Sequence, residues 1–417
     1  MSTKIDLLKE EIYKGENAQL ICDLIMAAAV EAGASDIHIE PLSNFVRLRY
    51  RVDGVLQEVL EYQKFLHANL VARFKILSNL KIDESRMPQD GRISTSIDEK
   101  GMDLRVSTLP TVNGEKIVMR IVDKSKKIPD LDVLGIEGSN GRILDRSIHQ
   151  PNGIVLTSGP TGSGKSTTLY SCLIRLNTPD VNIMTLEDPV ENTVDGINQS
   201  QVYPSIGYTF ASGLRTALRQ DPDIIMVGEI RDHETINIAI EASLTGHLVV
   251  STIHTNSAAE TITRILNMGI PGFLLPASVN CIIAQRLIRR ICPHCRKAVK
   301  AQDLPAKLQE DVRRSIGRTR KEELVERVSS DILKDPIFYE PVGCEKCNGG
   351  YKGRVGIYEI LEITPKIKEM ILKESSAVDI HEVAVSDGMI SLEQDGVIKA
   401  LNGQTSLEEV YAAAKQG

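Results

Sequence analysis

The chain has 417 residues, with a hydrophobic fraction of 42% and a charged fraction of 25%, as is typical of a soluble globular protein with about two to four domains. Its formal net charge of -7 argues against a protein that coats nucleic acid through charge alone, because phosphate contacts need clustered Lys and Arg. No stretch approaches the roughly 18 consecutive apolar residues of a membrane span, and the polar start of the chain lacks the apolar core of a signal peptide. We therefore expect a cytoplasmic protein that associates with a membrane only through partners.

The first region, residues 1–123, has the pattern of an α+β domain. An amphipathic helix is predicted over residues 16–33. Alternating strand patterns follow, with a helix at about residues 64–79 between them. A lysine-rich segment, residues 124–139, has the composition of a linker. The apolar face predicted for the first helix consists of Leu20, Leu24, Ile25 and Ala28.

The next region, residues 140–290, alternates apolar strands with helical segments, which predicts a mostly parallel α/β sheet. The strands read GIVLTSG, VNIMTLED, DIIMVGE and HLVVSTIH. After residue 290 the strand patterns fade. Two cysteine pairs then bracket a charged helical insert in a segment that we assign to residues 291–355, and helices from about residue 364 dominate the last region, residues 356–417.

The most specific motif, G-x-x-x-x-G-K-[ST], lies at residues 159–166, directly after a predicted strand and at the start of a predicted helix. Glycines let the backbone curl so that successive N–H groups point at phosphate oxygens, and the helix N-terminus adds to this attraction. Lys165 would reach the β- and γ-phosphates of ATP, and the Ser166 hydroxyl would bind Mg²⁺. A glycine-rich turn without a ligand is the alternative, but the strand and helix context favours a nucleotide site. The predicted nucleotide-binding residues are Gly159, Pro160, Thr161, Gly162, Ser163, Gly164, Lys165, Ser166 and Thr167.

Three further strands of the predicted sheet are flanked by charged or histidine side chains. Glu187 and Asp188 follow one strand, Glu229 follows the next, and His247 and His254 lie at opposite ends of the third. Because ligands bind outside the carboxyl ends of parallel strands, the carboxylates and His254 could converge on a γ-phosphate and a water. Taken singly, Asp188 could instead be a helix N-cap and His247 a satisfied core histidine. Their order after a phosphate-binding loop favours the functional interpretation.

Four of the seven cysteines form two C-x₂-C pairs, Cys292 with Cys295 and Cys344 with Cys347. In a reducing compartment this pattern is typical of a tetrahedral structural zinc site. Closing the intervening segment costs about 3.4 kcal/mol plus a constant, which is well below the roughly 10–16 kcal/mol of apparent zinc affinity in such sites. The remaining cysteines stand singly and are predicted to be small core residues: Cys22, Cys172 and Cys281.

Together the motifs resemble those of the ATPases of type II secretion and type IV pilus assembly. GPTGSGKSTT, TLEDPVE, LRQDPDIIMVGEIRD and TGHLVVSTIHTN match the family's Walker A, Asp box, Walker B and His box. ASDIHIEP, RYRVDGVL, MPQDGRIS and GEKIVMRIVD resemble its second N-terminal domain, and GYKGRVGIYEIL its C-terminal region. The resemblance covers the chain from about residue 17 onward. It implies an α/β fold built on a RecA-like P-loop NTPase core, with an N-terminal α+β (PAS-like) domain and a C-terminal zinc-binding and helical region.

The resemblance also implies a function. Members of this family are homo-hexameric motors on the cytoplasmic side of the inner membrane, docked on platform proteins, and they use ATP and Mg²⁺ to drive assembly of pilin-like subunits. A Zn²⁺-binding tetracysteine element is typical of the secretion and pilus-extension ATPases and is generally lacking in retraction ATPases, which favours the assembly direction here. Members that power secretion often carry a further N-terminal domain. Because only about 16 residues precede the match, we expect a naturally short or truncated chain.

Residue by residue, the resemblance implies that Glu187 orients the attacking water and that Glu229 stands near Mg²⁺, through water. Gly228 stands where an aspartate is usual in a Walker B strand, although it matches this family's own pattern. His247 and His254 would sense the γ-phosphate, and His254 is expected to approach the nucleotide more closely.

Two arginines of the N-terminal region, Arg105 and Arg120, match positions at which the family closes arginines over the phosphates. One inserted arginine can contribute roughly 10³–10⁵ in rate; the alternative is that both are ordinary strand arginines facing solvent. The predicted catalytic residues are thus Glu187, Glu229, Lys165, His254, His247, Arg105 and Arg120.

Two other functions remain open from the sequence. A RecA-like core also serves nucleic-acid translocases, although the acidic net charge, the aromatic fraction of 4% and the lack of Trp disfavour base stacking. A nucleotide-binding assembly protein without catalytic activity is the other alternative. We expect no nucleic-acid partner.

Overall fold

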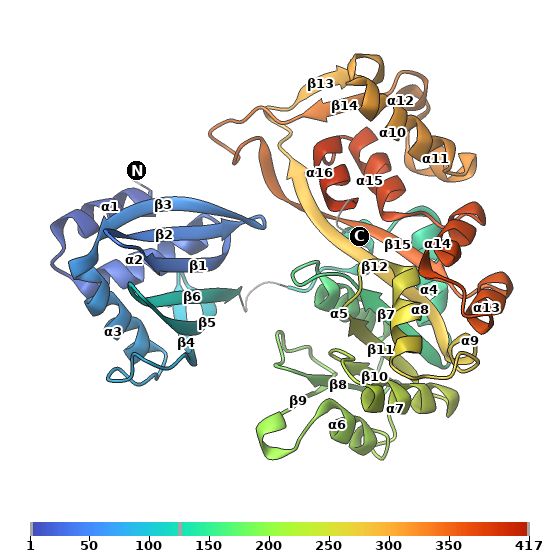
Figure 1. The fold of residues 1–417 in the computed structure, drawn as a ribbon, viewed down its shortest axis with the longest axis horizontal. Coiled ribbons are helices and arrows are strands. Elements are labelled where there is room, and N and C mark those ends of the chain that lie inside the picture. Colours follow the sequence, from blue (N-terminus) through green and yellow to red (C-terminus); the bar gives the residue numbers. More distant parts are fainter. Residues whose placement is uncertain (1–2, 124–126, 415–417) are drawn as a thin grey trace. The chain divides into compact units, whose positions relative to one another are not determined.

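The chain divides into two units, residues 1–127 and residues 128–417, here called the N-terminal and the C-terminal unit. The structure is a computed structural model that describes residues 3–123 and 127–414. Figure 1 shows the order of the helices and strands along the chain. Among the described residues, no helix has the length and apolar character needed to cross a bilayer.

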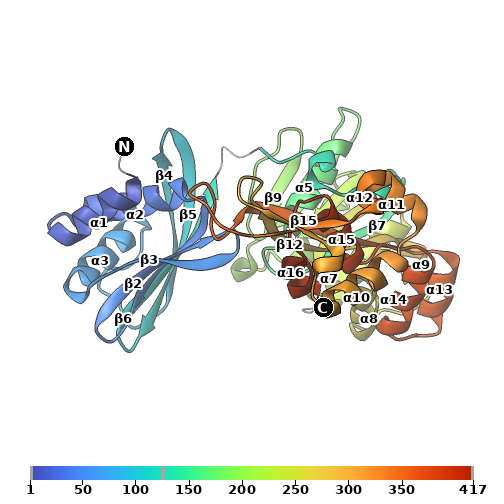
Figure 2. The same cartoon turned by 90° about the horizontal axis from the view of Figure 1, so that it is seen from above.

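The N-terminal unit is a six-stranded antiparallel sheet with helices on one face (Figure 2). The strand order is β3-β2-β1-β6-β5-β4. Apolar side chains alternate along the strands and pack against the helices, which leaves the charged side chains on the opposite face. The strands are β1 (Ala34–Pro41), β2 (Phe45–Val52), β3 (Val55–Gln63), β4 (Gln89–Ile97), β5 (Lys100–Thr111) and β6 (Gly114–Asp123), and the helices are α1 (Lys4–Lys14), α2 (Ala18–Glu31), the 3-10 turn η1 (Lys64–Leu66) and α3 (His67–Leu77).

The helices predicted over residues 16–33 and 64–79 are confirmed as α2 and, with its preceding turn, α3. One detail was wrong: Leu20, predicted on the buried face of α2, is 39% exposed, whereas Ile21 and Cys22 are fully buried. The reason is that α2 packs against α1, α3 and β1 together, so its buried face is wider and differently oriented than a single packing layer would require. Helix α1 was not predicted.

The C-terminal unit is built on a seven-stranded sheet in the order β15-β12-β7-β11-β10-β8-β9 (Figure 1). All neighbouring pairs are parallel except β12 with β15. The central strands are buried on both faces, as expected of a parallel sheet, and a separate apolar cluster lies on each face. The strands are β7 (Gly153–Ser158), β8 (Ile183–Glu187), β9 (Asn198–Gln201), β10 (Ile224–Val227), β11 (Leu248–Ile253), β12 (Val279–Ile291) and β15 (Tyr351–Glu362).

Helices cover both faces of this sheet. Residues of α4 and α5 belong to the cluster on one face, and residues of α6, α7, α8, α13 and α14 to the cluster on the other. The helices and turns up to β12 are η2 (Leu131–Leu134), α4 (Gly138–Ile148), α5 (Lys165–Leu176), η3 (Pro204–Ile206), α6 (Phe210–Ala217), α7 (His233–Leu244), α8 (Ala258–Asn267) and α9 (Leu275–Ser278).

The fading of strand patterns after residue 290 did not mark the end of the sheet. Strand β15 returns to the sheet as its edge strand, so the boundary predicted at residues 355 and 356 falls inside a strand. A small two-stranded sheet and the predicted helical insert lie between β12 and β15, and the predicted final helices follow β15. These elements are β13 (Lys297–Lys300), η4 (Ala301–Asp303), α10 (Ala306–Gly317), α11 (Lys321–Arg327), α12 (Ser330–Lys334), β14 (Ile337–Glu340), α13 (Pro365–Leu372), α14 (Ala377–Ser386), α15 (Leu392–Leu401) and α16 (Leu407–Ala414).

The predicted linker, residues 124–139, is only partly a connection. Residues 124–126 lie outside the described residues. Its second half forms η2, where Leu131 is buried in the apolar cluster that contains α5, and the first residues of α4 also fall within the predicted range. The C-terminal unit therefore begins earlier than the sequence pattern indicated.

Candidate functional site

The glycine-rich loop joins β7 to α5 at the carboxyl edge of the sheet. Gly159, Gly162 and Gly164 have φ values of 143°, 78° and 90°, in the region that side chains rarely adopt. A Cβ at Gly159 would lie 2.5 Å from the carbonyl oxygen of Gln285 on β12. All three glycines are therefore required by backbone conformation, and Gly159 also by the close approach of the neighbouring strand.

Lys165, the first residue of α5, bends back over this loop. Its Nζ donates hydrogen bonds to the carbonyl oxygens of Gly159 at 2.7 Å and Pro160 at 3.1 Å, and the residue is only 8% exposed. Burial lowers the pKa of the Lys165 ammonium, and the negative charge of Glu229 opposes this shift. The lysine side chain thus lies inside the loop.

Glu229 lies just beyond β10 and faces two basic side chains. One carboxylate oxygen is 2.5 Å from a guanidinium nitrogen of Arg231, and the other is 3.4 Å from Nε2 of His254, which follows β11. The Glu229 side chain is 16% exposed. Glu229 and the neighbouring Asp188 raise the pKa of Arg231. The parallel order of the strands thus brings together the ends of three elements, as expected for a ligand site in an open α/β sheet.

Gly228, which stands where a Walker B aspartate is usual, is explained by packing. Its N–H donates to the carbonyl oxygen of Leu186 at 2.8 Å, and a Cβ at this position would lie 3.1 Å from that oxygen and 3.5 Å from Cα of Glu187. The first contact is tighter than most real Cβ contacts, so an aspartate here would push against the end of β8.

Glu187, at the end of β8, is buried with 4% of its surface exposed. Oε1 accepts hydrogen bonds from Thr185 Oγ1 at 2.5 Å and from Gln199 Nε2 at 3.1 Å, and Oε2 accepts one from the hydroxyl of Tyr170 on α5. Burial, followed by the hydrogen bond to Glu187, raises the pKa of Tyr170. Both carboxylate oxygens are therefore engaged by protein groups, and the role predicted for Glu187 stays a prediction.

The two predicted histidines lie at opposite ends of β11, as the sequence indicated. His254 is at the carboxyl edge beside Glu229, whereas His247 precedes the strand at the other edge of the sheet. There, Nδ1 of His247 lies 2.9 Å from the carbonyl oxygen of Ala242, and the carbonyl oxygen of His247 accepts a hydrogen bond from Gly153. Of these two histidines, His254 is thus the one at the glycine-rich loop's edge of the sheet.

Arg105 and Arg120 belong to the N-terminal unit, where they lie directly opposite each other on β5 and β6. Both are on the face of the sheet that points away from the helices. Nε of Arg120 donates to Asp36 at 3.0 Å, and the Arg120 side chain is 58% exposed. The predicted closure of these arginines over phosphates stays a prediction.

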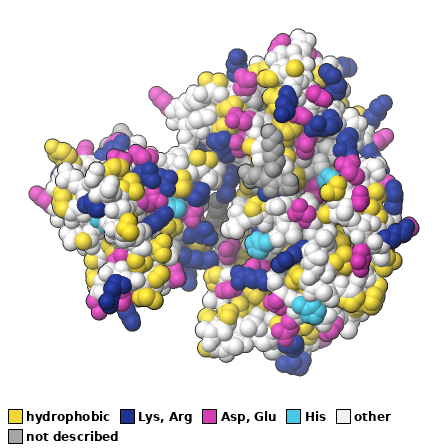
Figure 3. Space-filling view, in the orientation of Figure 1, with side chains coloured by type: hydrophobic (Ala, Val, Ile, Leu, Met, Phe, Trp, Pro, Cys, Tyr) yellow, Lys and Arg dark blue, Asp and Glu magenta, His cyan; other side chains and the backbone are white. Residues whose placement is uncertain are grey.

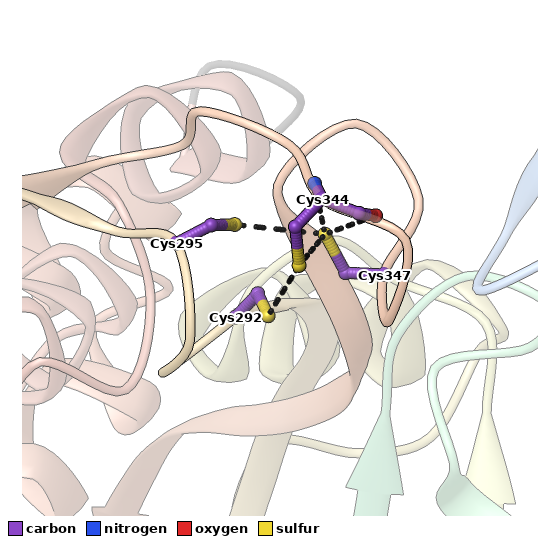
Figure 4. A group of neighbouring side chains, drawn as sticks. All are labelled: Cys292, Cys295, Cys344 and Cys347. Atoms are coloured by element: carbon purple, nitrogen blue, oxygen red, sulfur yellow. Dashed lines mark hydrogen bonds between the residues drawn. The ribbon is translucent and has the colours of Figure 1, made fainter.

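The two cysteine pairs come together, as predicted, and their side chains point toward one another (Figure 4). The four Sγ atoms lie within 4.8 Å of one another, with separations of 4.0 Å for Cys292 to Cys344 and 3.6 Å for Cys295 to Cys347. Tetrahedral zinc with Zn–S bonds of about 2.3 Å requires Sγ separations of about 3.8 Å, so this cluster fits the metal. Cys22, Cys172 and Cys281 are buried, which confirms them as core residues.

One thiol of this cluster is held in an environment that favours the metal-binding thiolate. Burial opposes ionisation of Cys347, but hydrogen bonds from Cys344, including its backbone N–H at 3.3 Å, outweigh it and lower the pKa of Cys347 to about 7. The thiolate is the form of cysteine that binds metals.

On the visible face of the C-terminal unit, acidic and basic side chains are interspersed (Figure 3).

Several residues at this edge were not found from the sequence. Tyr170, Gln199, Arg231 and Gln285 contact the predicted site residues or the glycine-rich loop, but only Tyr170 and Arg231 lie within three residues of a motif residue in the chain. The positions of Arg231, two residues after Glu229, and of Tyr170, three residues after Thr167, were the available signals.

Comparison with known proteins agrees with the motifs. The family model described as "Type II/IV secretion system protein" matches residues 13–412. The chain is 48% identical over 388 residues to the type IV pilus assembly ATPase PilB of Pseudomonas aeruginosa, covering 93% of this chain and 66% of that protein. It is 45% identical over 411 residues to type II secretion system protein E of Dickeya dadantii, covering 98% of this chain and 78% of that protein. The chain therefore spans slightly less than two thirds of the first relative's length.

Among solved structures, the pilus retraction motor PilT with bound ADP superimposes with a TM-score of 0.59 and 25% identity, covering 94% of this chain and 96% of that chain. The similarity extends over both units, which supports the α/β fold class with its N-terminal α+β region.

Proposed function

This chain belongs to the type II/IV secretion system protein family, whose matching members are secretion and pilus-assembly ATPases, and we propose that it is a motor ATPase that hydrolyses ATP to drive assembly of a type II secretion pseudopilus or a type IV pilus. One observation carries this proposal beyond the family: the buried ammonium of Lys165 lies inside the glycine-rich loop, and Glu229 meets His254 at two neighbouring strand ends on the same edge of the sheet. This arrangement places a phosphate-binding group and a carboxylate at the same edge of the sheet.

Nucleotide binding rests on the loop. The N–H groups of residues 159–167 and the N-terminus of α5 attract the phosphates, and Lys165 exchanges its two carbonyl contacts for phosphate oxygens. The Ser166 hydroxyl and the Glu229 carboxylate supply oxygen ligands, directly or through water, which are the ligands that Mg²⁺ prefers. When bound, Mg²⁺ supplies positive charge that neutralises the phosphates during transfer.

For the attacking water we favour Glu229 over Glu187. Glu229 is partly accessible and lies beside His254, whereas the oxygens of Glu187 already accept hydrogen bonds from three side chains. Glu187 then fixes the end of β8. His254 responds to the γ-phosphate through its contact with Glu229.

To move pilin-like subunits, ATP hydrolysis must be coupled to movements between subunits of the motor and to proteins at the membrane. We propose a homo-hexamer in the cytoplasm, held at the inner membrane by platform proteins, in which Arg105 and Arg120 of the N-terminal unit approach the phosphates as the units rotate. His247, at the other edge of the sheet, has no role in the chemistry of its own subunit. The tetracysteine element binds one Zn²⁺ as a structural support, and its presence favours assembly over retraction.

The decisive experiment compares the purified chain with Lys165→Ala. The unchanged chain is expected to bind ATP and release phosphate in the presence of Mg²⁺, and the variant to lose binding because the ammonium that neutralises the phosphates is gone. Equal turnover by the variant, or no nucleotide binding by the unchanged chain, overturns the proposal.

The nucleic-acid translocase alternative receives no support, because the matching relatives are secretion and pilus proteins. Stimulation of ATP turnover by DNA or RNA would revive it.

The choice between a secretion system and a pilus can be made by asking which pilin-like subunit, when its platform is present, stimulates ATP hydrolysis.

A further inference from the structure

Gln285 lies on strand β12, next to β7, and its side chain contacts the glycine-rich loop. It is 2% exposed, and both ends of its side-chain amide are occupied: Nε2 donates to the carbonyl oxygen of Ser163 at 2.7 Å, and Oε1 accepts from the Thr168 hydroxyl at 2.8 Å. The residue follows directly on Ala284, which pairs with Ser158, the last residue of β7. Gln285 is therefore fixed where β7 ends and the loop begins.

The orientation of the Gln285 amide is determined by its partners. The Ser163 carbonyl oxygen can only accept, so the NH₂ group of Gln285 must face it, and the Thr168 hydroxyl then donates its proton to Oε1. Thr168 itself is 1% exposed and lies one turn into α5. One buried side chain thus connects the loop, the helix that follows it, and a strand more than a hundred residues later in the chain.

This contact fixes a peptide plane of the loop. In a trans peptide the carbonyl group and the following N–H point in opposite directions. Because Gln285 holds the Ser163 carbonyl toward β12, the N–H of Gly164 points away from β12. Gly164 has the left-handed conformation that starts α5, and a Cβ there would lie 3.2 Å from Nε2 of Gln285.

We propose that Gln285 is a positioning residue for nucleotide binding: it sets the Ser163–Gly164 peptide so that the Gly164 N–H is presented to the nucleotide phosphates. This inference rests on the proposed function. It assigns Gln285 to affinity for the phosphates, not to the cleavage step, since its side chain is buried behind the loop. Loss of one N–H contact to a charged phosphate weakens binding by roughly tenfold to a hundredfold.

The test is equilibrium binding of a fluorescent ADP or ATP analogue to the purified full chain and to Gln285→Glu. The glutamate has nearly the same shape but turns an oxygen toward the Ser163 carbonyl, so the peptide loses its donor and is repelled. Gln285→Met keeps about the same side-chain volume and introduces no charge. It serves as the second variant if Gln285→Glu does not fold. Both variants are expected to raise the Kd and the KM for ATP roughly tenfold to a hundredfold, while kcat at saturating ATP changes far less.

Gln394 offers a matched control. It is also a buried glutamine, 3% exposed, with Nε2 donating to the Thr319 hydroxyl and Oε1 accepting from the N–H of Ser391 in the C-terminal helices. Gln394→Glu is expected to lower thermal stability and leave nucleotide affinity unchanged. Thr168→Val, which removes the hydroxyl that donates to the amide oxygen of Gln285, is expected to weaken binding and to add little in the Gln285→Met background.

The outcomes separate this inference from the function on which it rests. Folded Gln285→Glu or Gln285→Met that binds nucleotide within about twofold of the unchanged chain overturns the role of Gln285 and leaves the ATPase intact. An equal loss of affinity in Gln394→Glu would also overturn it, because the effect would then follow from lost stability. An unchanged chain that binds no nucleotide overturns both.

Discussion

The hydroxyl of Tyr170 donates a hydrogen bond to the carboxylate of Glu187 and so connects the helix after the glycine-rich loop to the end of β8. Both residues are almost fully buried, at 1% and 4% exposure. A buried carboxylate that loses a donor keeps the cost of its own desolvation. The pair therefore stabilises the packing of α5 against the sheet.

Tyr170→Phe is expected to lower the free energy of unfolding by about 1–3 kcal/mol, because one oxygen of Glu187 is left without its donor. The measurement is denaturant unfolding of the C-terminal unit within the full chain. Tyr203→Phe, at a residue that is 50% exposed, serves as the control and is expected to change little. Equal effects of the two substitutions would contradict the importance of the buried pair.

Substitution of the two candidate carboxylates distinguishes their roles. Glu229→Gln is expected to retain ATP and lose turnover by about a hundredfold or more, because it removes the carboxylate that we assign to the water. Glu187→Gln is expected to lower stability, since the NH₂ that replaces one of the two oxygens cannot accept the hydrogen bond that Tyr170 or Thr185 donates there. Phosphate release and melting temperature are measured for both. If Glu229→Gln still hydrolyses ATP while Glu187→Gln is folded but inactive, Glu187 and not Glu229 orients the attacking water, as the sequence predicted.

The cysteine cluster is expected to hold one zinc ion per chain. Cys344→Ser should abolish stoichiometric zinc and lower the melting temperature, because two segments separated by the helical insert are no longer joined. Metal content by atomic emission is the measurement, and Cys281→Ser, at a buried cysteine outside the cluster, should retain zinc. Full zinc content in Cys344→Ser would show that the cluster is not the metal site.

Glu40 of the N-terminal unit makes stability depend on pH. Burial alone would raise its pKa, but hydrogen bonds from Arg49 and Lys116 outweigh burial and lower the pKa of Glu40 to about 2, from an ordinary value of 4.5. A lowered pKa in the folded state contributes stability above pH 4.5, and this contribution is lost as the pH falls from 4.5 toward 2.

Glu40→Gln is accordingly expected to lower stability at pH 7 and to flatten the loss of stability in acid. Calorimetric unfolding of the full chain between about pH 2 and 7 measures both effects. Glu10→Gln, at an exposed helical position, is the control. If the free energy of unfolding falls as steeply below pH 4.5 in Glu40→Gln as in the unchanged chain, the pH dependence does not come from Glu40.

Short-range patterns predicted much of the fold. Strands β7, β10 and β11 were visible as apolar runs because a parallel sheet buries both faces of its strands. Strand β15 was missed as a member of the sheet because its antiparallel pairing with β12 is made across the whole helical insert. A strand pattern does not tell which sheet the strand joins.

The candidate site divides in the same way. The sequence by itself determined the phosphate-binding loop, the carboxylate and histidine at successive strand ends, and the four cysteines, because each depends on backbone conformation or spacing within a few residues. Only the tertiary structure decided that Glu187 is enclosed by Tyr170 and that Gln285 supports the loop. Those facts depend on strand order and packing between distant segments, and contacts of this kind impose no local pattern on the chain.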